Sequence, residues 1–419
     1  MEDCRVQKFE VAVIPMTETP DIKMRGLESI SCLAGSLDIT NVPLVPFSDE
    51  ACAFLAELSS VLMADAQAHT YPDIISFAFW CRKSNIEKAR QHALARMGSL
   101  DNRIGRGLSF HIAPSNIPVN FAFSFAFSLL AGNANIVRVP SKPFQQVRII
   151  CSAVNAVLPR YQEISNRCAF ISYPHDDDIT TLFSQRADAR LIWGGDKTVQ
   201  KLQAIPRLPR CVDIMFSDRY SLALINGTFI DAADDSTLAS LAKKFYNDTY
   251  LMDQNACSSP QLIVWQHASV STRQRFWSHV RAYAEKTYYL QAQVAIDKYV
   301  QLCRDIMEGS AKPQSSFDGI LTTVNLDHLP GNIHDLRGQG GYFYQIDISN
   351  LIEIASHITE RVQTLVYFGY EPDELRDFII KNTLRGIDRI VPIGSAMDID
   401  IVWDGHDLVS ELSRIVDTR

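Results

Sequence analysis

The sequence lacks three features that would each point to a specialised class of protein. No two cysteines are spaced as C-x-x-C, no Lys/Arg run reaches the roughly 5 to 8 residues of a nucleic-acid patch, and no unbroken apolar stretch reaches the ~18 residues of a membrane span. The segment MEDCRVQKFEVAVIP has neither the basic start nor the apolar core of a signal peptide. We therefore expect no metal site, no nucleic-acid partner, no membrane span and a cytoplasmic location.

The composition is that of an ordinary globular protein. The 419 residues are 47% hydrophobic and 21% charged, and 40 basic against 48 acidic residues leave a formal net charge of −8. At roughly 100 to 200 residues per domain, the chain is long enough for two or three domains. A disordered protein and a disulfide-stapled miniprotein are both excluded.

The cysteines are scattered singly, which predicts reduced thiols and leaves open which of them is reactive. The nine are Cys4, Cys32, Cys52, Cys81, Cys151, Cys168, Cys211, Cys257 and Cys303.

From residue 105 onward, short β-branched runs alternate with longer helical patterns, as in α/β proteins with parallel sheets. The first series predicts strands at 109–112, 135–139, 168–172, 191–193 and 212–216, and helices at 118–130, 144–158, 177–185 and 197–204. The pattern restarts at 221–225, with helices at 237–250, 272–285 and 295–307 and strands at 261–265, 319–324, 341–348, 363–369 and 388–393. Before residue 105 we expect a strand at Glu10–Ile14 and helices at 51–68 and 84–97.

One predicted helix contradicts its own periodicity, because NFAFSFAFSLL places phenylalanines two apart, as a strand would. The segment is too long for a typical strand of about 5 to 6 residues. Pro118 suits the first turn of a helix and Gly132 suits its end. We predict a helix that is buried on all sides.

Two polar loops carry candidate chemistry. Asn116 follows the strand at 109–112, at the carboxyl edge where α/β sheets bind ligands, and its carboxamide can donate to a developing oxyanion. The competing interpretation of Asn116 is a helix N-cap or an Asx turn. Cys257 lies in the loop of YLMDQNACSSPQLIVW among small and polar neighbours, unlike the usual buried cysteine. Cys257 is therefore a candidate nucleophile.

Several ordered motifs together resemble the aldehyde dehydrogenase superfamily and, within it, the bacterial long-chain acyl-CoA and acyl-protein thioester reductases. These motifs are HIAPSNIPVNFAF, LLAGNANIVRVPSK, IWGGDKTVQ, DQNACSSPQ and GIDRIVPIG followed by DIVWDG. The resemblance implies an α/β, aldehyde-dehydrogenase-like fold with a Rossmann-type cofactor domain and a second α/β catalytic domain. We expect these at residues 1–225 and 226–390, with 391–419 as a bridging or oligomerisation segment.

The resemblance also implies roles for individual residues. Cys257 falls on the catalytic cysteine and Asn116 on the asparagine of the oxyanion hole. Arg138 stands where many members have a lysine that contacts the cofactor ribose, and Ser141 replaces a glutamate that binds the ribose hydroxyls in NAD-preferring relatives. Without that carboxylate, and with Lys142 beside it, a phosphorylated ribose is favoured, so the expected cofactor is NADPH.

Two further positions bear on the chemistry. In IWGGDKTVQ, the backbone N–H groups near Gly194 and Gly195 are expected to face the cofactor, although such a turn is also an ordinary strand-to-helix connection. The superfamily's general-base glutamate has no counterpart, since an ungapped match places Met215 there. Its absence argues against hydrolysis to a carboxylic acid. Asp213 and Asp218 lie nearby but are expected to be ordinary strand-end or turn carboxylates.

The implied function is NADPH-dependent reduction of long-chain fatty acyl thioesters, acyl-CoA or acyl-protein, to fatty aldehydes through a Cys257 acyl-enzyme. The implied partners are acyl-protein synthetase and acyl-transferase subunits and further copies of the chain. Two alternatives stay open: a CoA-acylating short-chain aldehyde dehydrogenase, and a catalytically silent binding subunit.

Other polar features are expected to be structural. HDDDIT has metal-ligand residue types, but it packs them consecutively before a helix, so Asp177 is predicted to be a helix cap. The glycine-rich GQGGYFY at 338–344 is expected to be a structural loop. His111 and His267 are expected to be bystanders.

Overall fold

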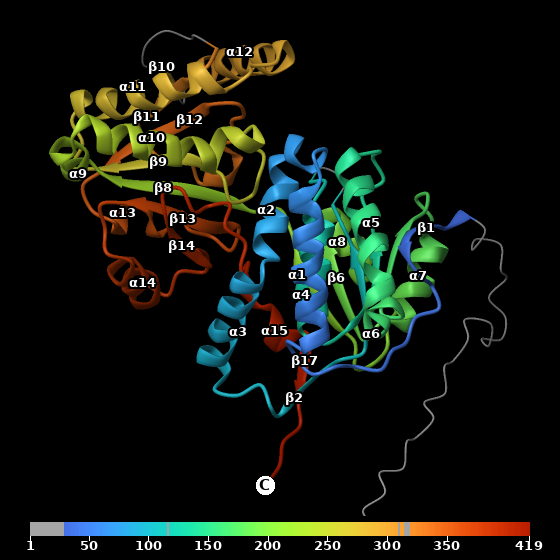
Figure 1. Cartoon of the computed structure of the whole chain (residues 1–419). Coiled ribbons are helices and arrows are strands. Elements are labelled where there is room, and N and C mark those ends of the chain that lie inside the picture. Colours follow the sequence, from blue (N-terminus) through green and yellow to red (C-terminus); the bar gives the residue numbers. More distant parts are fainter. Residues whose placement is uncertain (1–28, 115–116, 309–310, 314–318) are drawn as a thin grey trace, which may run out of the picture. The chain divides into compact units, whose positions relative to one another are not determined.

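The computed structural model describes residues 29–114, 117–308, 311–313 and 319–419, and the strand predicted at Glu10–Ile14 lies outside them. The chain divides into two compact units (Figure 1). One runs up to Ser217 and includes His406–Arg419, and the other is Asp218–Gly405.

This division differs from the expected boundaries at 225/226 and 390/391 for two reasons of strand pairing. β8 (Tyr220–Asn226) pairs with strands of the second sheet on both sides, so the chain enters the second unit before this strand. β17 (Ser413–Ile415) pairs with β2 (Arg103–Gly105), so the last residues return to the first unit.

The sheet of the first unit has the order β1-β5-β4-β3-β6-β7, and its pairings are parallel except that of β1 with β5. Its strands are β1 (Ser31–Gly35), β3 (Leu108–Ile112), β4 (Ala134–Arg138), β5 (Cys168–Ser172), β6 (Ala189–Trp193) and β7 (Val212–Phe216). The parallel sheet predicted after residue 105 is confirmed, whereas β1 was missed.

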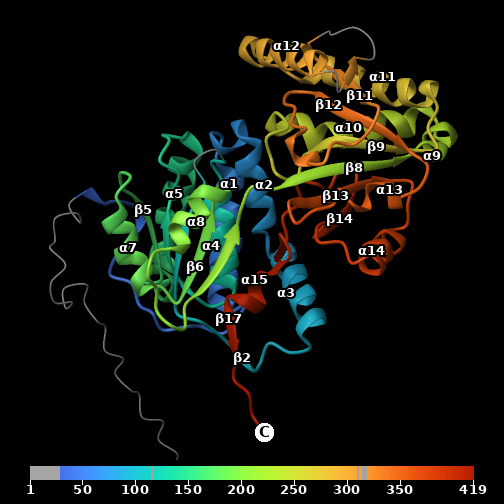
Figure 2. The ribbon, with the colours of Figure 1, turned by 180° about the vertical axis from the view of Figure 1, so that it is seen from behind.

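Helices cover both faces of this sheet (Figure 2). The helices of the first unit are α1 (Asp49–Ala64), α2 (Pro72–Trp80), α3 (Lys83–Met97), α4 (Asn120–Leu130), α5 (Gln145–Val157), α6 (Gln162–Ser165), α7 (Asp177–Arg186), α8 (Asp196–Gln203) and α15 (Leu408–Glu411). Of these, α3 packs on α1 and α2 and not on the strands. Because side chains alternate along a strand, Phe110 of β3 contacts Phe183 of α7, while His111 contacts Ser124 of α4 on the other face.

Two helices test the sequence predictions closely. NFAFSFAFSLL forms α4, and every residue of it is buried, as predicted. The cap of α7 is a correction, because Asp176 and not Asp177 accepts hydrogen bonds from the N–H groups of Asp178 (2.9 Å) and Ile179 (3.1 Å). Capping needs a carboxylate one residue before the first turn, and Asp177 already lies inside the helix.

The sheet of the second unit has the order β10-β11-β12-β9-β8-β13-β14 and is parallel except for β10 with β11. The other strands are β9 (Pro260–Gln266), β10 (Ala311–Pro313), β11 (Thr322–Leu326), β12 (Tyr342–Ile348), β13 (Val362–Phe368) and β14 (Arg389–Pro392), with β15 (Val402–Trp403) and β16 (His406–Asp407) later in the chain. The helices are α9 (Gly227–Ala232), α10 (Asp235–Thr249), α11 (Val270–Thr287), α12 (Ala292–Met307), α13 (Ile352–Ala355) and α14 (Pro372–Lys381).

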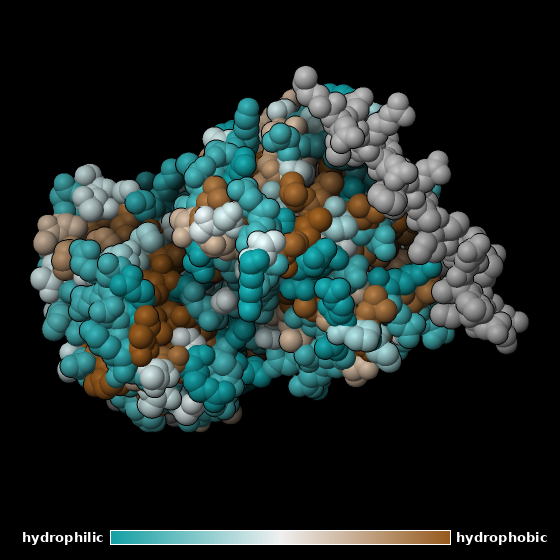
Figure 3. All heavy atoms as spheres, turned by 90° about the horizontal axis from the view of Figure 1, so that it is seen from below, coloured by the Kyte–Doolittle hydropathy of each residue, from teal (hydrophilic) through white to brown (hydrophobic). Residues whose placement is uncertain are grey.

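Apolar side chains form a core on each face of this second sheet. Phe245 of α10 and Phe276 of α11 belong to one core, and Leu302 of α12 and Leu375 of α14 belong to the other. Within the described ranges, no helix combines the length and apolarity needed to cross a bilayer. Figure 3 shows hydrophobic residues in patches between hydrophilic ones, which is ordinary for a globular surface and marks no site by itself.

A buried ion pair joins two neighbouring strands of the first sheet. Arg190 of β6 is fully buried, and its Nε and Nη2 each lie 2.7 Å from a carboxylate oxygen of Asp213 on β7. Arg190 also donates to the carbonyls of Leu202 and Ile205. Asp213 is therefore a structural carboxylate, as expected.

We predict that Arg190→Ala lowers the free energy of unfolding by about 3 to 5 kcal/mol, because the buried Asp213 carboxylate loses its ion-pair partner. Arg207→Ala is the matched control, since Arg207 lies 3.5 Å from the same carboxylate but its side chain is 42% exposed. The control is expected to cost under about 1 kcal/mol. Urea denaturation measures both, and equal losses would contradict the assignment.

Candidate active site

The loops predicted to bind a cofactor follow three neighbouring strands, β4, β3 and β6, at one edge of the first sheet. The chain runs from β3 outward to β4 and β5 and then returns to β6 on the other side of β3, which makes a topological switch point. Ligands of open α/β sheets bind at the carboxyl edge of such a point. Asn116, in the loop after β3, lies outside the described residues, so its role stays a prediction.

Arg138 ends β4 and has its guanidinium carbon 4.3 Å from the centroid of the Tyr173 ring. Its Nη2 also lies 3.5 Å from the carbonyl oxygen of Pro174. Ser141 and Lys142 follow in the same loop and are exposed. This loop therefore presents cations to solvent at the edge of the sheet. A cation–π contact with Tyr173 holds the Arg138 guanidinium in place.

The two glycines after β6 are not equivalent. Gly194 donates its N–H to the carbonyl of Phe216 at 3.0 Å, so this donor is engaged within the protein. Gly195 is the N-cap residue of α8, and a Cβ built on it meets no atom within 4 Å. Of the two glycines, only Gly195 therefore leaves open space at the start of α8 that a phosphate could enter.

Behind these loops lies a buried polar network centred on His111. Its ring nitrogens lie 2.8 Å from Ser124 Oγ and 3.0 Å from Asn135 Oδ1, and Trp193 Nε1 donates to the same serine oxygen at 3.1 Å. Burial lowers the pKa of His111 to about 4, so the ring is neutral. His111 ties β3, β4, β6 and α4 together.

Cys257 lies in the second unit, between the short helix Tyr250–Met252 that follows α10 and the strand β9. Ser221 Oγ donates to the Cys257 carbonyl at 2.6 Å, and the backbone N–H of Arg219 donates to the Cys257 sulfur. Burial raises the pKa of the Cys257 thiol, and Asp218 and Asp404 raise it further, while the Arg219 amide and the charge of Arg337 oppose the rise. The resting side chain is therefore a thiol.

A buried glutamine, Gln254, holds this loop. Its Oε1 accepts from the N–H groups of Gly341 and Tyr342, both at 3.2 Å, and its Nε2 donates to the carbonyls of Pro260 (3.2 Å) and Tyr342 (3.0 Å). Its own carbonyl accepts from Gln261 Nε2 at 2.7 Å. Five hydrogen bonds thus join the Cys257 loop to β9, to β12 and to Gly341, which directly precedes β12.

The same loop contains backbone strain. Asp253 and Gln254 have φ values of 49° and 63°, which is rare outside glycine. Gly340 and Gly341, which have φ values of 57° and 87°, pack against Asp253 and Gln254. The Gly340 N–H donates to the Asp253 carbonyl at 3.0 Å. Gly340 and Gly341 of the glycine-rich loop, which was predicted to be structural, therefore support the Cys257 loop, while Gly338 and Gln339 line the cavity beside Cys257.

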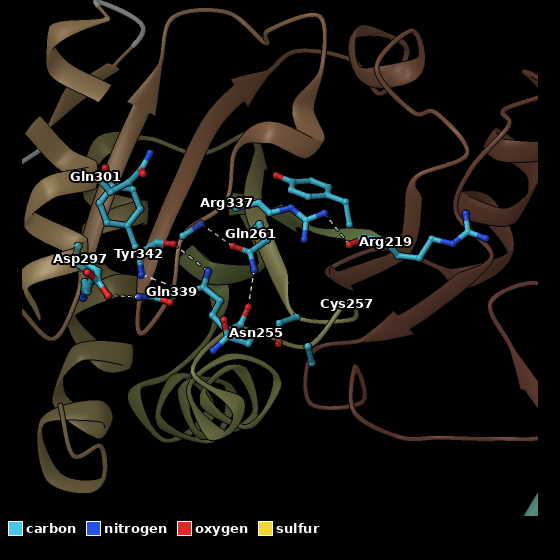
Figure 4. Close-up of a pocket in the computed structure, with 15 residues that line it drawn as sticks. Arg219, Asn255, Cys257, Gln261, Asp297, Gln301, Arg337, Gln339 and Tyr342 are labelled. Atoms are coloured by element: carbon cyan, nitrogen blue, oxygen red, sulfur yellow. Dashed lines mark hydrogen bonds between the residues drawn. The ribbon is translucent and has the colours of Figure 1, made fainter. Parts of the chain in front are cut away.

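A cavity of about 250 Å³ borders Cys257 (Figure 4). Its walls come from the segment 254–261, from Asp297, Lys298 and Gln301 of α12, and from the segment 337–339 with Tyr342. Asp218, the other carboxylate near the position of the missing general base, forms an ion pair with Arg337, whose Nη2 lies 2.9 Å away. Among the described residues, no group of three or more His, Cys, Asp or Glu side chains is placed to hold a metal ion.

Solved structures with a similar fold define the class. The 1-pyrroline-5-carboxylate dehydrogenase from Thermus with bound NAD matches with a TM-score of 0.57 at 10% identity, over 87% of this chain and 77% of that one. The NADP-dependent glyceraldehyde-3-phosphate dehydrogenase from Bacillus halodurans complexed with NADP gives 0.55 at 13% identity, over 87% and 85%. At such identities the likeness shows the fold alone, and it confirms the aldehyde-dehydrogenase-like α/β class.

Within that class, the chain belongs to the acyl-CoA reductase (LuxC) family, whose profile matches residues 56–301. The long-chain acyl-protein thioester reductase of Aliivibrio fischeri is 31% identical over 164 residues, which are 37% of this chain and 31% of that protein. The match therefore spans about a third of this curated relative. The family predicted from the motifs is confirmed.

We predict that Gln254→Ala lowers the free energy of unfolding of the second unit by about 1 to 3 kcal/mol, because two buried N–H groups lose their acceptor. The loosened loop should also make Cys257 react faster with iodoacetamide, as followed by peptide mass spectrometry. Gln274→Ala is the control, because Gln274 is an exposed glutamine of α11 and does not line the cavity beside Cys257. The control should stay within about 0.5 kcal/mol of the parent.

An unchanged alkylation rate in Gln254→Ala would show that the strained loop does not depend on this carboxamide.

Proposed function

We propose that the chain reduces long-chain fatty acyl thioesters to aldehydes with NADPH, through an acyl-enzyme on Cys257. The observation that carries this is a cysteine held beside a cavity by a strained, heavily hydrogen-bonded loop, in a chain of the acyl-CoA reductase family. The relative from Aliivibrio fischeri is named as a long-chain acyl-protein thioester reductase, which supports the same substrate class.

In the proposed first step, the Cys257 sulfur attacks the thioester carbonyl. The Asn116 carboxamide and the Cys257 backbone N–H stabilise the oxyanion, and the acyl group then stays on sulfur while the donor thiol leaves with the proton. The sulfur loses its proton only as it reacts, because its pKa is raised at rest. Met215 stands where a hydrolytic relative has its general base, so water is not activated and the acyl-enzyme survives until it is reduced.

The first unit is the proposed site of the dinucleotide. When bound, NADPH supplies the hydride that reduces the acyl group. Open space over Gly195 and the exposed Lys142 and Ser141 beside Arg138 fit a phosphorylated ribose and a pyrophosphate, while the engaged N–H of Gly194 contributes no donor. Of the two solved structures compared above, one holds NAD and the other NADP, so the preference for NADPH is carried by Arg138, Ser141 and Lys142.

The proposal includes a setting for the reaction. Acyl-protein synthetase and acyl-transferase subunits supply the acyl group, the chain assembles with copies of itself, and the complex works in the cytoplasm.

We predict that radiolabelled tetradecanoyl-CoA, given without reduced dinucleotide, acylates Cys257, and that NADPH then releases the label as aldehyde. Cys257→Ser should lose both labelling and NADPH oxidation, whereas Cys303→Ser, which changes a partly exposed cysteine of α12, should keep them. Peptide mapping of the label identifies the residue.

Label on another residue would falsify the Cys257 assignment. Equal activity with two-carbon donors would favour a short-chain CoA-acylating enzyme, and full activity in Cys257→Ser would favour a silent subunit.

We further predict that replacing both Arg138 and Lys142 by alanine raises the KM for NADPH by about tenfold or more, through the loss of charge-assisted contacts. The KM for NADH should change little, because NADH lacks the 2′-phosphate. Lys88→Ala is the matched control, since Lys88 is an exposed cation on α3, a helix that precedes the strands of the parallel sheet. Steady-state kinetics with both dinucleotides measure the effect, and an equal rise for NADH would overturn the assignment of the 2′-phosphate.

A further inference from the structure

The chain passes between the two units twice, and the two connections lie side by side. They fall between residues 217 and 218 and between residues 405 and 406. Within the first unit, the ring centroids of Phe216 and His406 are 5.6 Å apart. Within the second unit, Arg219 Nε lies 3.4 Å from Asp404 Oδ1. An ion pair therefore joins the two connections at the point where the chain enters and leaves the second unit.

Asp404 is buried by a tight turn at the end of the motif DIVWDG. Asp404 and Gly405 have φ values of 56° and 78°, the pattern of a two-residue hairpin turn, for which Asp-Gly is a favoured pair. The Asp404 side chain is 2% exposed, and it accepts from Gln363 Nε2 at 2.6 Å. Burying a carboxylate is costly unless it is paired, so the Arg219 guanidinium stabilises Asp404 in this position.

Arg219 is held at its backbone as well as at its guanidinium. Its backbone N–H donates to the Cys257 sulfur, and its carbonyl accepts from Arg337 Nη2 at 3.2 Å. Its guanidinium also donates to the carbonyl of Glu360. In Figure 4 the Arg219 side chain extends away from the other labelled residues of the cavity. The guanidinium therefore serves as the anchor of a backbone amide that lies on the sulfur.

We propose that Asp404 is a positioning residue for Cys257: by pairing with Arg219, it fixes the backbone amide that donates to the sulfur. A fixed donor stabilises the thiolate that forms during attack and limits the directions in which the sulfur can point. Because Asp404 and Arg219 stand at the two connections between the units, the pair links both connections to the reacting atom. The inference rests on the proposed role of Cys257 as nucleophile, but its test needs no acyl donor.

The test is the rate at which iodoacetamide alkylates Cys257, measured as a function of pH by peptide mass spectrometry. Arg219→Gln combined with Asp404→Asn removes the pair and leaves neither charge unpaired. The sulfur then loses its fixed donor, so the profile should shift upward by about half a pH unit and alkylation near neutral pH should slow by about threefold. Asp218 and Arg337, the other charges that act on the sulfur, are unchanged in this variant.

The direction of the shift separates positioning from charge. The Arg219 amide acts on the thiol more strongly than the Asp404 charge does, and the two act in opposite directions. If the pair acted only through its charges, the profile would stay in place or move downward, and the proposal would be overturned. Alkylation of the buried Cys81 in the same spectra reports any unfolded protein.

A second ion pair of the same unit provides the matched control. Arg385 Nη2 also lies 3.4 Å from a carboxylate oxygen, that of Glu360, but these side chains are 77% and 60% exposed. Arg385→Gln combined with Glu360→Gln should leave the profile of Cys257 unchanged. An equal shift in the control would mean that any loosening of the unit slows the sulfur, and positioning by Asp404 would be wrong.

The conservative variant Arg219→Lys keeps a cation for Asp404 and should retain the parental profile. A shift as large as that of the double variant would show that Asp404 does not hold the amide by pairing, which overturns the proposal even if the double variant fails to fold. Failure of fatty acyl donors to acylate Cys257 would overturn the proposed function instead, because alkylation by iodoacetamide does not depend on it.

Discussion

The environment of Cys257 depends on one buried carboxamide. Gln254 adopts a backbone conformation that costs a non-glycine residue roughly 1 kcal/mol or more, and it persists because both ends of its side chain are paired with the backbone of β12 and of the Pro260 segment. Gly340 and Gly341 are required on the other side, since a Cβ on Gly341 would lie 2.4 Å from the carbonyl oxygen of Ile320. A strained loop held so firmly keeps the cysteine at one position relative to the cavity.

The electrostatic surroundings of Cys257 also limit its reactivity at rest. Burial and two nearby carboxylates favour the neutral thiol, and the Arg219 amide only partly offsets them. A neutral thiol reacts slowly with solutes that collide at random, because the thiolate is the nucleophile. A donor that displaces water and aligns its carbonyl gains most from such a site, so the structure favours a bound substrate over incidental electrophiles.

Local patterns predicted much of the fold, and long-range contacts account for what they missed. The bounds of β5 and β7 were predicted to the residue, and length decided α4 correctly against its period-two pattern. The return of residues 406–419 to the first unit was missed because β17 pairs with residues some 300 positions earlier, which no window detects. Gln254 was missed for the same reason, since its neighbours in sequence do not reveal its contact with Gly341. Cys257 is a candidate because of its small polar neighbours and the family motifs, and the structure adds the cavity beside it.

The closing strand also has a consequence for synthesis. The pairing of β2 with β17 must wait until the ribosome has made residues 410–415. So must the hydrogen bonds that the buried Arg103 side chain donates to Ser413 Oγ at 2.8 Å and to the Ser410 carbonyl at 2.7 Å. The whole of 218–405 is translated in between, as a continuous insertion in the first unit. The second unit can therefore acquire its structure while the first is still open, and residues 406–419 complete the first unit only after the second has been made.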